Sequence, residues 1–378
     1  MSRRGSWFAR AGLLLILLTL TACLPGWEVG LVGPEGASWS VNRDVLRELT
    51  LSDDEQEVAL EYVLYAAGYD LVESVHLVSE TGDTWSVIWE EGADSVWWTM
   101  KGELRIGEQS IRPERIEVVP LVPPAPVTAH ITDIAPTLAA ALGRPAPSEA
   151  TGRALDAAPA EHVVLLFLDG FGYVRYLEAR EAGLIPVLGA LAPPHPALTT
   201  YPPVTSVSSA SMVTGAPPSV HGATHRGIRR TEVETIFDVI AEAGLTSAAV
   251  EGNALAFNLP RTEIILSGDR DGDGSTDDNV LANALEVIRQ GMPEFLWIHF
   301  HGIDDAGHTY GPGAPEEAAT IRAVDGYVGE ILAELPESTL VMIVADHGMH
   351  SVEEDGRSGN HGHLIARDML IPIFVVQP

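Results

Sequence analysis

Short apolar runs recur along the second part of the chain, and each of them predicts a buried strand. They cover residues 163–168, 246–250, 295–300, 340–345 and 371–376. Between these runs, apolar residues recur at helical spacing, most clearly from Ile321 to Leu335. Strands and helices that alternate in this way predict an α/β fold over residues 129–378, with a mainly parallel sheet sandwiched by helices.

A different pattern over residues 39–119 predicts a small α+β domain in front of this fold. We expect a helix over 53–67, followed by three short strands between Gly turns, at 84–90, 95–100 and 103–106. Five tryptophans gather in this Trp-rich domain: Trp39, Trp85, Trp89, Trp97 and Trp98. Core packing is their expected use, binding of a sugar or peptide is the alternative, and the sequence indicates no specific partner. A proline-rich stretch over 120–128 predicts a stiff linker between the two domains.

The N-terminus predicts a lipoprotein signal peptide over residues 1–22. Three arginines flank the start of an apolar run over 13–20, which is too short to span a bilayer. Leu-Thr-Ala-Cys resembles a bacterial lipobox and implies that Cys23 is lipidated after cleavage; an uncleaved anchor or an ordinary signal peptide are the alternatives. Residues 23–38 are expected to form a tether. We therefore expect an exported lipoprotein, anchored on the outer side of the cytoplasmic membrane.

Charge and cysteine content narrow the chemistry. The 378 residues include 22 Lys and Arg against 53 Asp and Glu, which gives a formal net charge of −31. Binding to a nucleic-acid backbone needs a basic face, so we expect this acidic protein not to bind nucleic acid in that way. Cys23 is the only cysteine, so a metal would have to be bound by imidazoles and carboxylates.

Acidic and imidazole side chains follow several of the predicted strands. Asp169 follows the first run, Asp346 and His347 follow the run over 340–345, and Asp304 and His308 come after the run over 295–300. Each residue alone is typical of a turn or a loop. Because ligands bind at the carboxyl ends of parallel strands, we expect these side chains to converge and to form a metal site.

A further imidazole, His361 in Gly-Asn-His-Gly, completes this set of candidate ligands. Oxygen and nitrogen ligands without thiolate suit catalytic Zn²⁺, with Mn²⁺ or Fe as alternatives. Thr205 stands just before a small-residue helical stretch and is the candidate nucleophile, since a helix N-terminus presents free N–H groups to an anion. An ordinary helix cap is the alternative for Thr205.

Five motifs, in order, resemble the alkaline phosphatase superfamily, and most of all its nucleotide pyrophosphatase/phosphodiesterase branch. They are Asp169-Gly-Phe-Gly, Tyr201-Pro-Pro-Val-Thr205 with Val213-Thr-Gly215 and Ser219-Val-His-Gly222, Asp304-Asp-Ala-Gly-His308-Thr-Tyr-Gly-Pro312, Ala345-Asp-His-Gly-Met349 and His361-Gly362. The motifs fall within residues 163–376, more than half of the chain. The resemblance implies an alkaline phosphatase-like core and a metal-dependent phosphodiesterase or phosphatase.

The resemblance also implies a site with two Zn²⁺ ions. Asp169, Thr205, Asp346 and His347 would surround one ion, and Asp304, His308 and His361 the other, with His363 as a rival for His361. Thr205 would attack phosphorus and form a phospho-threonine, while the two ions hold the attacking and leaving oxygens.

Ser208 bears on the substrate, because this branch usually has an Asn three residues beyond the nucleophile to bind a phosphate oxygen. A hydroxyl can still donate one hydrogen bond to substrate, so monoester, diester and pyrophosphate all stay open. A sulfatase of this fold needs a Cys at the nucleophile position and is excluded. Small phosphate esters or lipid head groups suit the acidic chain better than polyanions.

Two other functions stay open. One is a phosphotransferase that passes the phosphoryl-linked group to a lipid or glycan acceptor. The other is a surface-anchored binding protein whose hydrolase fold is inactive, with the Trp-rich domain as its active part.

Two local features complete the prediction. Asp269, Asp271, Asp273 and Asp277 match Ca²⁺-binding positions of an EF-hand loop, although Val280 takes the place of the last ligand; a Ca²⁺ site and a solvated acidic turn are both open. Residues 132–143 resemble a helix that usually follows the last strand of this superfamily, which looks like a circular permutation. A helix that merely covers the sheet is the alternative.

Overall fold

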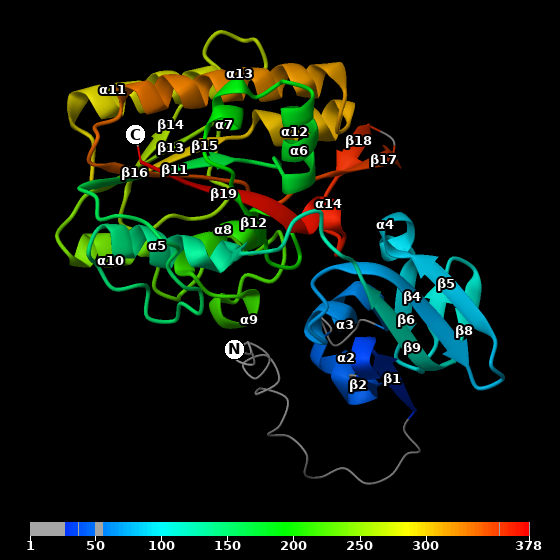
Figure 1. Ribbon diagram of the computed structural model, residues 1–378. Coiled ribbons are helices and arrows are strands. Elements are labelled where there is room, and N and C mark those ends of the chain that lie inside the picture. The colour runs from blue at the N-terminus through cyan, green and yellow to red at the C-terminus, as the bar shows by residue number, and fades with distance from the viewer. Residues whose placement is uncertain (1–26, 37, 50–55, 355, 378) are drawn as a thin grey trace. The chain divides into compact units, whose positions relative to one another are not determined.

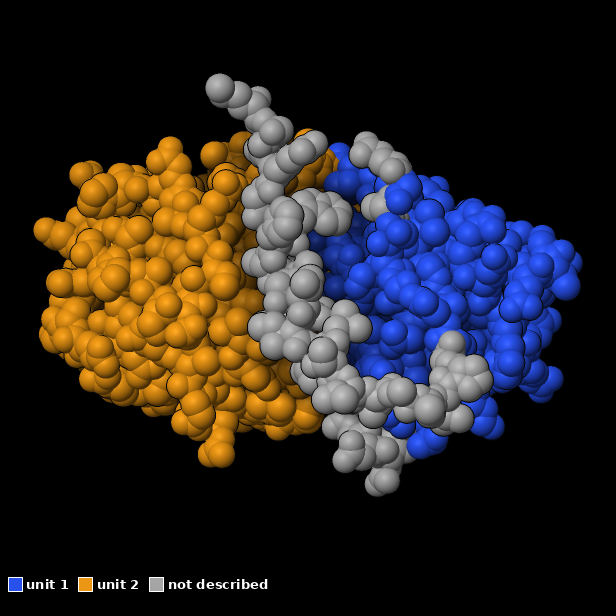
Figure 2. All heavy atoms as spheres, turned by 90° about the horizontal axis from the view of Figure 1, so that it is seen from below, with its two compact units in different colours: residues 1–124, 363–366 blue, residues 125–362, 367–378 orange. Residues whose placement is uncertain are grey.

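The chain divides into two compact units, shown in separate colours in Figure 2. The computed structural model describes residues 27–36, 38–49, 56–354 and 356–377. Unit 1 comprises residues 1–124 with 363–366, and unit 2 comprises 125–362 with 367–378. The predicted signal peptide and Cys23 lie outside the described residues. Within the described part of the chain, no helix is both long and apolar enough to cross a membrane.

An eight-stranded sheet forms the centre of unit 2, in the order β10-β12-β19-β16-β11-β15-β13-β14. All neighbours are parallel except β19, which runs antiparallel to β12 and β16. The strands are β10 (Ala129–His130), β11 (His162–Leu168), β12 (His195–Leu198), β13 (Ser247–Glu251), β14 (Glu263–Leu266), β15 (Phe295–Phe300), β16 (Thr339–Val344) and β19 (Leu370–Val376). The predicted mainly parallel sheet is confirmed.

Helices cover both faces of this sheet, as Figure 1 shows. One face carries α6 (Tyr173–Glu181), α7 (Pro186–Ala190), α11 (Asp277–Gly291), α12 (Gly302–Tyr310) and α13 (Pro315–Glu334). The other face carries α5 (Ile134–Ala141), α8 (Thr205–Thr214) and α10 (Ile236–Glu242). The remaining elements of the unit are η3 (Ile131–Asp133), α9 (Pro218–His221), α14 (Ala366–Met369) and a hairpin of β17 (His350–Glu354) and β18 (Arg357–Asn360). Strands covered on both faces need continuous apolar runs, and every residue of β15 and β16 is buried.

The carboxyl ends of three central strands lie side by side. Phe167 of β11 is in register with His299 of β15 on one side and with Val344 of β16 on the other. Glycine is required just beyond β11, because Gly170 has φ +73° and a Cβ there would lie 3.0 Å from Asp304 Cβ. The Asp-Gly motif therefore lets the loops after β11 and β15 approach closely.

The predicted helix over 132–143 lies beside α8. Its first turn, η3, begins after the N-cap His130, and Asp133 closes a capping box in which its Oδ2 accepts from the His130 N–H. Asp133 Oδ1 accepts from the Arg153 N–H. Gly143 ends the helix with φ +65°. These are the features expected of a covering helix; the circular permutation stays a prediction.

Unit 1 is an α+β structure with two sheets. The first has the order β2-β1-β9-β4-β5 and the second, which is fully antiparallel, has the order β3-β6-β7-β8. The strands are β1 (Glu28–Val32), β2 (Ser38–Asn42), β3 (Glu57–Ala59), β4 (Val72–Ser79), β5 (Thr84–Ile88), β6 (Val96–Thr99), β7 (Leu104–Ile106), β8 (Gln109–Ile111) and β9 (Pro113–Pro120). The helical segments are η1 (Pro34–Gly36), α2 (Arg43–Leu49), α3 (Leu60–Ala66), α4 (Trp89–Gly92) and η2 (Ala93–Ser95).

Two expectations for this unit differ from the structure. The expected tether over 23–38 contains β1, because Val29 and Leu31 alternate with less buried neighbours and the strand pairs with β9. The helix expected over 53–67 begins only at Leu60, since Glu57–Ala59 pairs with β6. Two of the tryptophans, Trp89 and Trp98, are fully buried, as expected for core residues, while Trp97 is 38% exposed.

Residues His363–Ala366 belong to unit 1 although they are distant from it in sequence. The buried Glu61 of α3 accepts hydrogen bonds from the Leu364 N–H at 2.9 Å and interacts with His363 Nδ1 at 3.1 Å. Trp89 Nε1 donates to the Leu364 carbonyl, and Glu90 accepts from the Ala366 N–H. This four-residue segment thus completes the core of unit 1.

Candidate metal centre

Thr205 is the first residue of α8 and the only one of that helix that is not buried. Its Oγ1 lies 3.2 Å from His347 Nε2. As the start of a ten-residue helix, this position also presents backbone N–H groups that have no partner within the helix. The hydroxyl therefore stands where an anion would be attracted.

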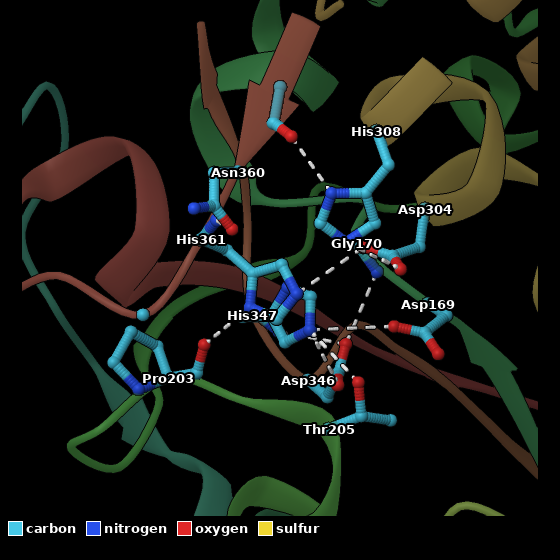
Figure 3. A network of polar contacts seen from close by, with 12 residues as sticks. Asp169, Gly170, Pro203, Thr205, Asp304, His308, Asp346, His347, Asn360 and His361 are labelled. Carbon is cyan, nitrogen blue, oxygen red and sulfur yellow. Dashed lines mark hydrogen bonds and ion pairs between the residues drawn. The ribbon is translucent and has the colours of Figure 1, made fainter. Parts of the chain in front are cut away.

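A first cluster of ligand atoms lies in front of Thr205 (Figure 3). It consists of Asp169 after β11 and of Asp346 and His347 after β16, whose ligand atoms lie within 4.8 Å of one another. His347 Nε2 is 3.1 Å from Asp346 Oδ2 and 3.5 Å from Asp169 Oδ1. Strand pairing in register brings these residues together, as the sequence predicted.

A second cluster is formed by Asp304, His308 and His361. Asp304 and His308 are four residues apart on α12 and therefore lie on the same face, with His308 Nε2 3.3 Å from Asp304 Oδ2. His361 follows β18, and its Nε2 is 3.8 Å from Asp304 Oδ1. The rings of His361 and His347 stack with centroids 3.7 Å apart, so the two clusters adjoin.

All three imidazoles are held by the same kind of contact. The Nδ1 atom of each lies at hydrogen-bonding distance from a backbone carbonyl: His308 from Gly359, His347 from Gly348 and His361 from Pro203, at 2.8–3.0 Å. A proton on Nδ1 leaves the lone pair of Nε2 free. Each Nε2 is thus prepared to bind a metal ion, and the carbonyls fix the ring.

The carboxylates fit a metal in the same way. Asp346 Oδ1 accepts from the N–H groups of Gly170 and His347. Among the described residues, however, Asp169 Oδ1, Asp304 Oδ1 and Asp346 Oδ2 are buried without any hydrogen-bond partner. Buried carboxylate oxygens are costly when they are left unpaired. One such oxygen on each of three neighbouring carboxylates, together with three free Nε2 atoms, suits divalent metal ions with O and N ligands.

The pKa values of these groups show how unfavourable the centre is without positive charge. Burial, and then the charges of Asp169 and Asp304, raise the pKa of Asp346 well above its ordinary value. Burial, and then His347, lower the pKa of His361 well below its ordinary value. The lowered pKa keeps His361 neutral, which is the form of imidazole that binds a cation, whereas Asp346 would need nearby positive charge to stay ionised.

His363 and Ser208 are placed differently from the other candidates. His363 interacts with Glu61 in unit 1, so His361 is the imidazole in the cluster. Ser208 is fully buried, and its Oγ lies 3.1 Å from the hydroxyl of Thr199. A contact of Ser208 with substrate would require its hydroxyl to leave Thr199.

Only three of the four residues predicted to form a Ca²⁺ loop lie close together. Carboxylate oxygens of Asp269, Asp271 and Asp273 lie within 4.8 Å of one another on the surface. Asp277 is buried instead, where its two oxygens accept from the N–H groups of His301 and Gly302 at 3.0 Å. Its expected place in the Ca²⁺ loop is wrong, because the carboxylate caps the start of α12. Binding of Ca²⁺ by the other three residues stays a prediction.

Two features near the centre were not predicted from the sequence. Glu251, His299 and His301 form a buried network against Asp169; the signal for it was a histidine inside an apolar run with another histidine two residues later. Burial would lower the pKa of His301, but its interactions with Asp169 and Glu251 raise it well above the ordinary value. Arg226 brings a positive charge close to Asp304, and its guanidinium lies 3.4 Å from the His361 carbonyl.

The Ser-Val-His-Gly motif has a structural use that gives a pH prediction. His221 is buried, with Nε2 2.9 Å from Ser211 Oγ of α8, and burial lowers its pKa to about 4. The unfolded chain binds this proton below pH ~6.5, so between pH 6.5 and 4 it holds more protons than the native state. We expect the native state to lose about 3 kcal/mol of stability from this group as pH falls through that window.

Urea unfolding at several pH values measures the effect. His221→Gln removes the titrating group and should flatten the pH dependence between pH 4 and 6.5. An equal slope in the variant and the parent protein would contradict the assignment.

Comparisons with known proteins place this site. Residues 163–371, more than half of the chain, match the family "Type I phosphodiesterase / nucleotide pyrophosphatase". The catalytic subunit of human GPI ethanolamine phosphate transferase 3 is 28% identical over 104 residues, which are 28% of this chain and 9% of that protein. Human ectonucleotide pyrophosphatase/phosphodiesterase family member 1 is 24% identical over 216 residues, 49% of this chain and 23% of that protein. The chain thus spans less than a quarter of the length of these relatives.

Two solved structures are also similar. Phosphonoacetate hydrolase from Sinorhizobium meliloti 1021 has a TM-score of 0.43 at 21% identity, over 55% of this chain and 61% of that one. Human ectonucleotide pyrophosphatase/phosphodiesterase 5 has a TM-score of 0.45 at 13% identity, over 58% of this chain and 88% of that one. The match over residues 163–371 includes every residue of both ligand clusters and Thr205. The chain belongs to the type I phosphodiesterase / nucleotide pyrophosphatase family.

Proposed function

We propose that the protein hydrolyses phosphoric esters through Thr205 at a centre that binds two Zn²⁺ ions, and that phosphodiesters are its substrates. One observation carries the proposal: Thr205 is the only residue of α8 that is not buried, and its Oγ1 lies 3.2 Å from His347 in the first of two adjoining clusters of imidazoles and unpaired carboxylate oxygens. The family match supports the diester, because it covers this whole arrangement.

Asp169, Asp346 and His347 would hold one ion beside Thr205, and Asp304, His308 and His361 would hold the other. Bound metal ions supply positive charge to the attacking and leaving oxygens of a phosphoryl transfer. The protein itself orients Thr205 Oγ1 for attack on phosphorus, through the fixed start of α8. The P–O bond to the leaving group breaks as the bond to Oγ1 forms, and water later attacks the same phosphorus and restores the hydroxyl.

Arg226 brings positive charge from the chain close to the centre. Asp304 attracts the Arg226 guanidinium, whose pKa is lowered by burial and then by Arg357. A guanidinium has five N–H donors, and the Arg226 guanidinium donates to the His361 carbonyl at 3.4 Å. We assign Arg226 to the binding of a further oxygen of the substrate.

A phosphotransferase is the second candidate. The similarity to proteins named GPI ethanolamine phosphate transferases favours it, although it covers only about a quarter of this chain. In that reaction the second attack on phosphorus comes from an acceptor hydroxyl instead of water. A lipid or glycan acceptor would suit a protein that is tethered to a membrane through a lipidated Cys23, which we propose as its location.

Hydrolysis of p-nitrophenyl phosphate and bis-p-nitrophenyl phosphate tests the proposal. With Zn²⁺ present, we expect release of p-nitrophenol, faster from the diester than from the monoester. Release that needs an added alcohol acceptor would favour the phosphotransferase. Failure to cleave either ester, with zinc demonstrably bound, would contradict the hydrolase and favour a binding protein.

A further inference from the structure

Behind Asp169 lies a buried network that the metal centre does not use directly. Glu251 ends β13, while Trp297 and His299 lie two residues apart on the neighbouring strand β15, and His301 follows that strand. Residues two apart on a strand point to the same face. Glu251 and His299 are at most 2% exposed, while the side chain of His301 is 22% exposed, so the network is shielded from solvent except at His301.

Both histidines connect the same two carboxylates. His299 Nδ1 is 2.9 Å from Glu251 Oε2, and its Nε2 is 3.1 Å from Asp169 Oδ2. His301 repeats the arrangement, with Nε2 3.3 Å from Glu251 Oε2 and Nδ1 3.5 Å from Asp169 Oδ2. Asp169 Oδ2 is therefore in contact with both histidines. The other oxygen, Oδ1, has no hydrogen-bond partner and lies 3.5 Å from His347 Nε2.

The rings of the network are held in place from outside. Phe167 of β11 stacks on His299 with centroids 3.7 Å apart and planes at 6°. The His301 ring also lies against His299, with centroids 3.7 Å apart and planes tilted by 37°. Trp297 Nε1 donates to Glu251 Oε1 at 2.8 Å, which fixes the remaining oxygen of that carboxylate. Each member of the network thus has its orientation set by a neighbour.

We propose that Glu251 is a positioning residue, which acts through His299 and His301 to hold Asp169 with Oδ1 directed at the metal ion beside Thr205. The inference rests on the proposed metal centre. Groups that orient a ligand typically change metal affinity by 10- to 100-fold when they are removed. The alternative use of the same side chains, as ligands of a third metal ion, fits less well. Asp169, His299 and His301 offer ligand atoms within 4.8 Å of one another, but both ring nitrogens of His299 already contact carboxylates, so a third ion would have to displace one of these contacts.

Glu251→Gln tests the proposal in the full-length protein. The amide keeps an oxygen that can accept from Trp297, but its NH₂ group cannot accept from the two histidines. Zinc per chain is measured by atomic absorption after dialysis against a series of zinc chelator concentrations. We expect the parent protein to hold two zinc ions. In the variant, we expect one ion to be lost at a 10- to 100-fold lower chelator concentration, with the other unchanged.

Asp325→Asn is the matched control. Asp325 is also a buried carboxylate of unit 2, but it accepts from the N–H groups of Val187 and Leu188 at the start of α7. The control should lower the melting temperature and keep both zinc ions at the parent affinity. This separates a specific effect on a ligand from general destabilisation.

Three results would overturn the proposal. If Glu251→Gln keeps both ions at the parent affinity and only lowers the melting temperature, the network has a structural role alone. If the parent protein binds three zinc ions and the variant loses the third, the histidines are themselves ligands. If the parent protein binds no zinc, the metal centre of the proposed function fails, and the role of Glu251 fails with it.

Discussion

Thr205→Ala should lower the turnover of a phosphate ester by at least about 10³-fold and leave the metal content unchanged. The reason is that Thr205 is the only residue of α8 that is not buried and its Oγ1 contacts His347 of the first cluster, so no neighbouring side chain of that helix can take its place. Steady-state hydrolysis of bis-p-nitrophenyl phosphate, with zinc measured on the same samples, gives both quantities. Thr205→Ser keeps a hydroxyl at this position and should retain a substantial part of the activity.

Ser209→Ala is the matched control for this variant. Ser209 lies four residues further along α8 and is buried, and its hydroxyl has no hydrogen-bond partner. Its removal should change turnover by less than about threefold, because it leaves the start of the helix intact. Equal activity of Thr205→Ala and Ser209→Ala would rule out the nucleophile.

Removal of the metal ions should lower the melting temperature and abolish turnover. Without positive charge, Asp169, Asp304 and Asp346 keep one unpaired buried oxygen each, and burial together with mutual repulsion raises the pKa of Asp346. An ion at 1,000 times its Kd stabilises the native state by about 4 kcal/mol. For a unit of this size, we expect a fall of the order of 10 °C per ion when a chelator is added. Thermal unfolding followed by circular dichroism, with zinc and with chelator, measures it.

His308→Gln separates the two ions in the same experiment. It removes one Nε2 from the second cluster and leaves the first cluster unchanged. The chelator should then lower the melting temperature by about half as much as in the parent protein. A melting temperature that is the same with zinc and with chelator would show that the clusters do not hold metal.

The sequence predicted that these acidic and imidazole side chains converge, because their convergence depends on one rule of parallel sheets. Asp169 and Asp346 follow neighbouring strands in register, so an acid after an apolar run was sufficient to place both at one edge. The i, i+4 spacing of Asp304 and His308 likewise needed only the geometry of a helix. Local sequence patterns were therefore sufficient to predict at which edge of the sheet these side chains lie and which residue types meet there.

Other parts of the site depend on contacts that no local pattern encodes. His299 lies inside an apolar run that was interpreted as strand core, and Glu251 directly follows another; they meet only because β13 and β15 are neighbours. Asp277 fits a Ca²⁺ loop by spacing, but the start of α12 competes for its carboxylate. In unit 1, Glu61 binds residues about three hundred positions later, a separation at which the sequence gives no indication of pairing.

The segment His363–Ala366 has a consequence for modularity. Unit 1 includes these residues of the C-terminal part of the chain, so it is discontinuous in sequence and cannot be detached by a single cut in the linker. A chain truncated to residues 129–378 would leave Leu364 and Ile365, now at most 2% exposed, without the core that buries them. Newly exposed apolar residues of this kind favour association. The N-terminal unit therefore cannot be treated as a separable module, because four of its residues come from the C-terminal part of the chain.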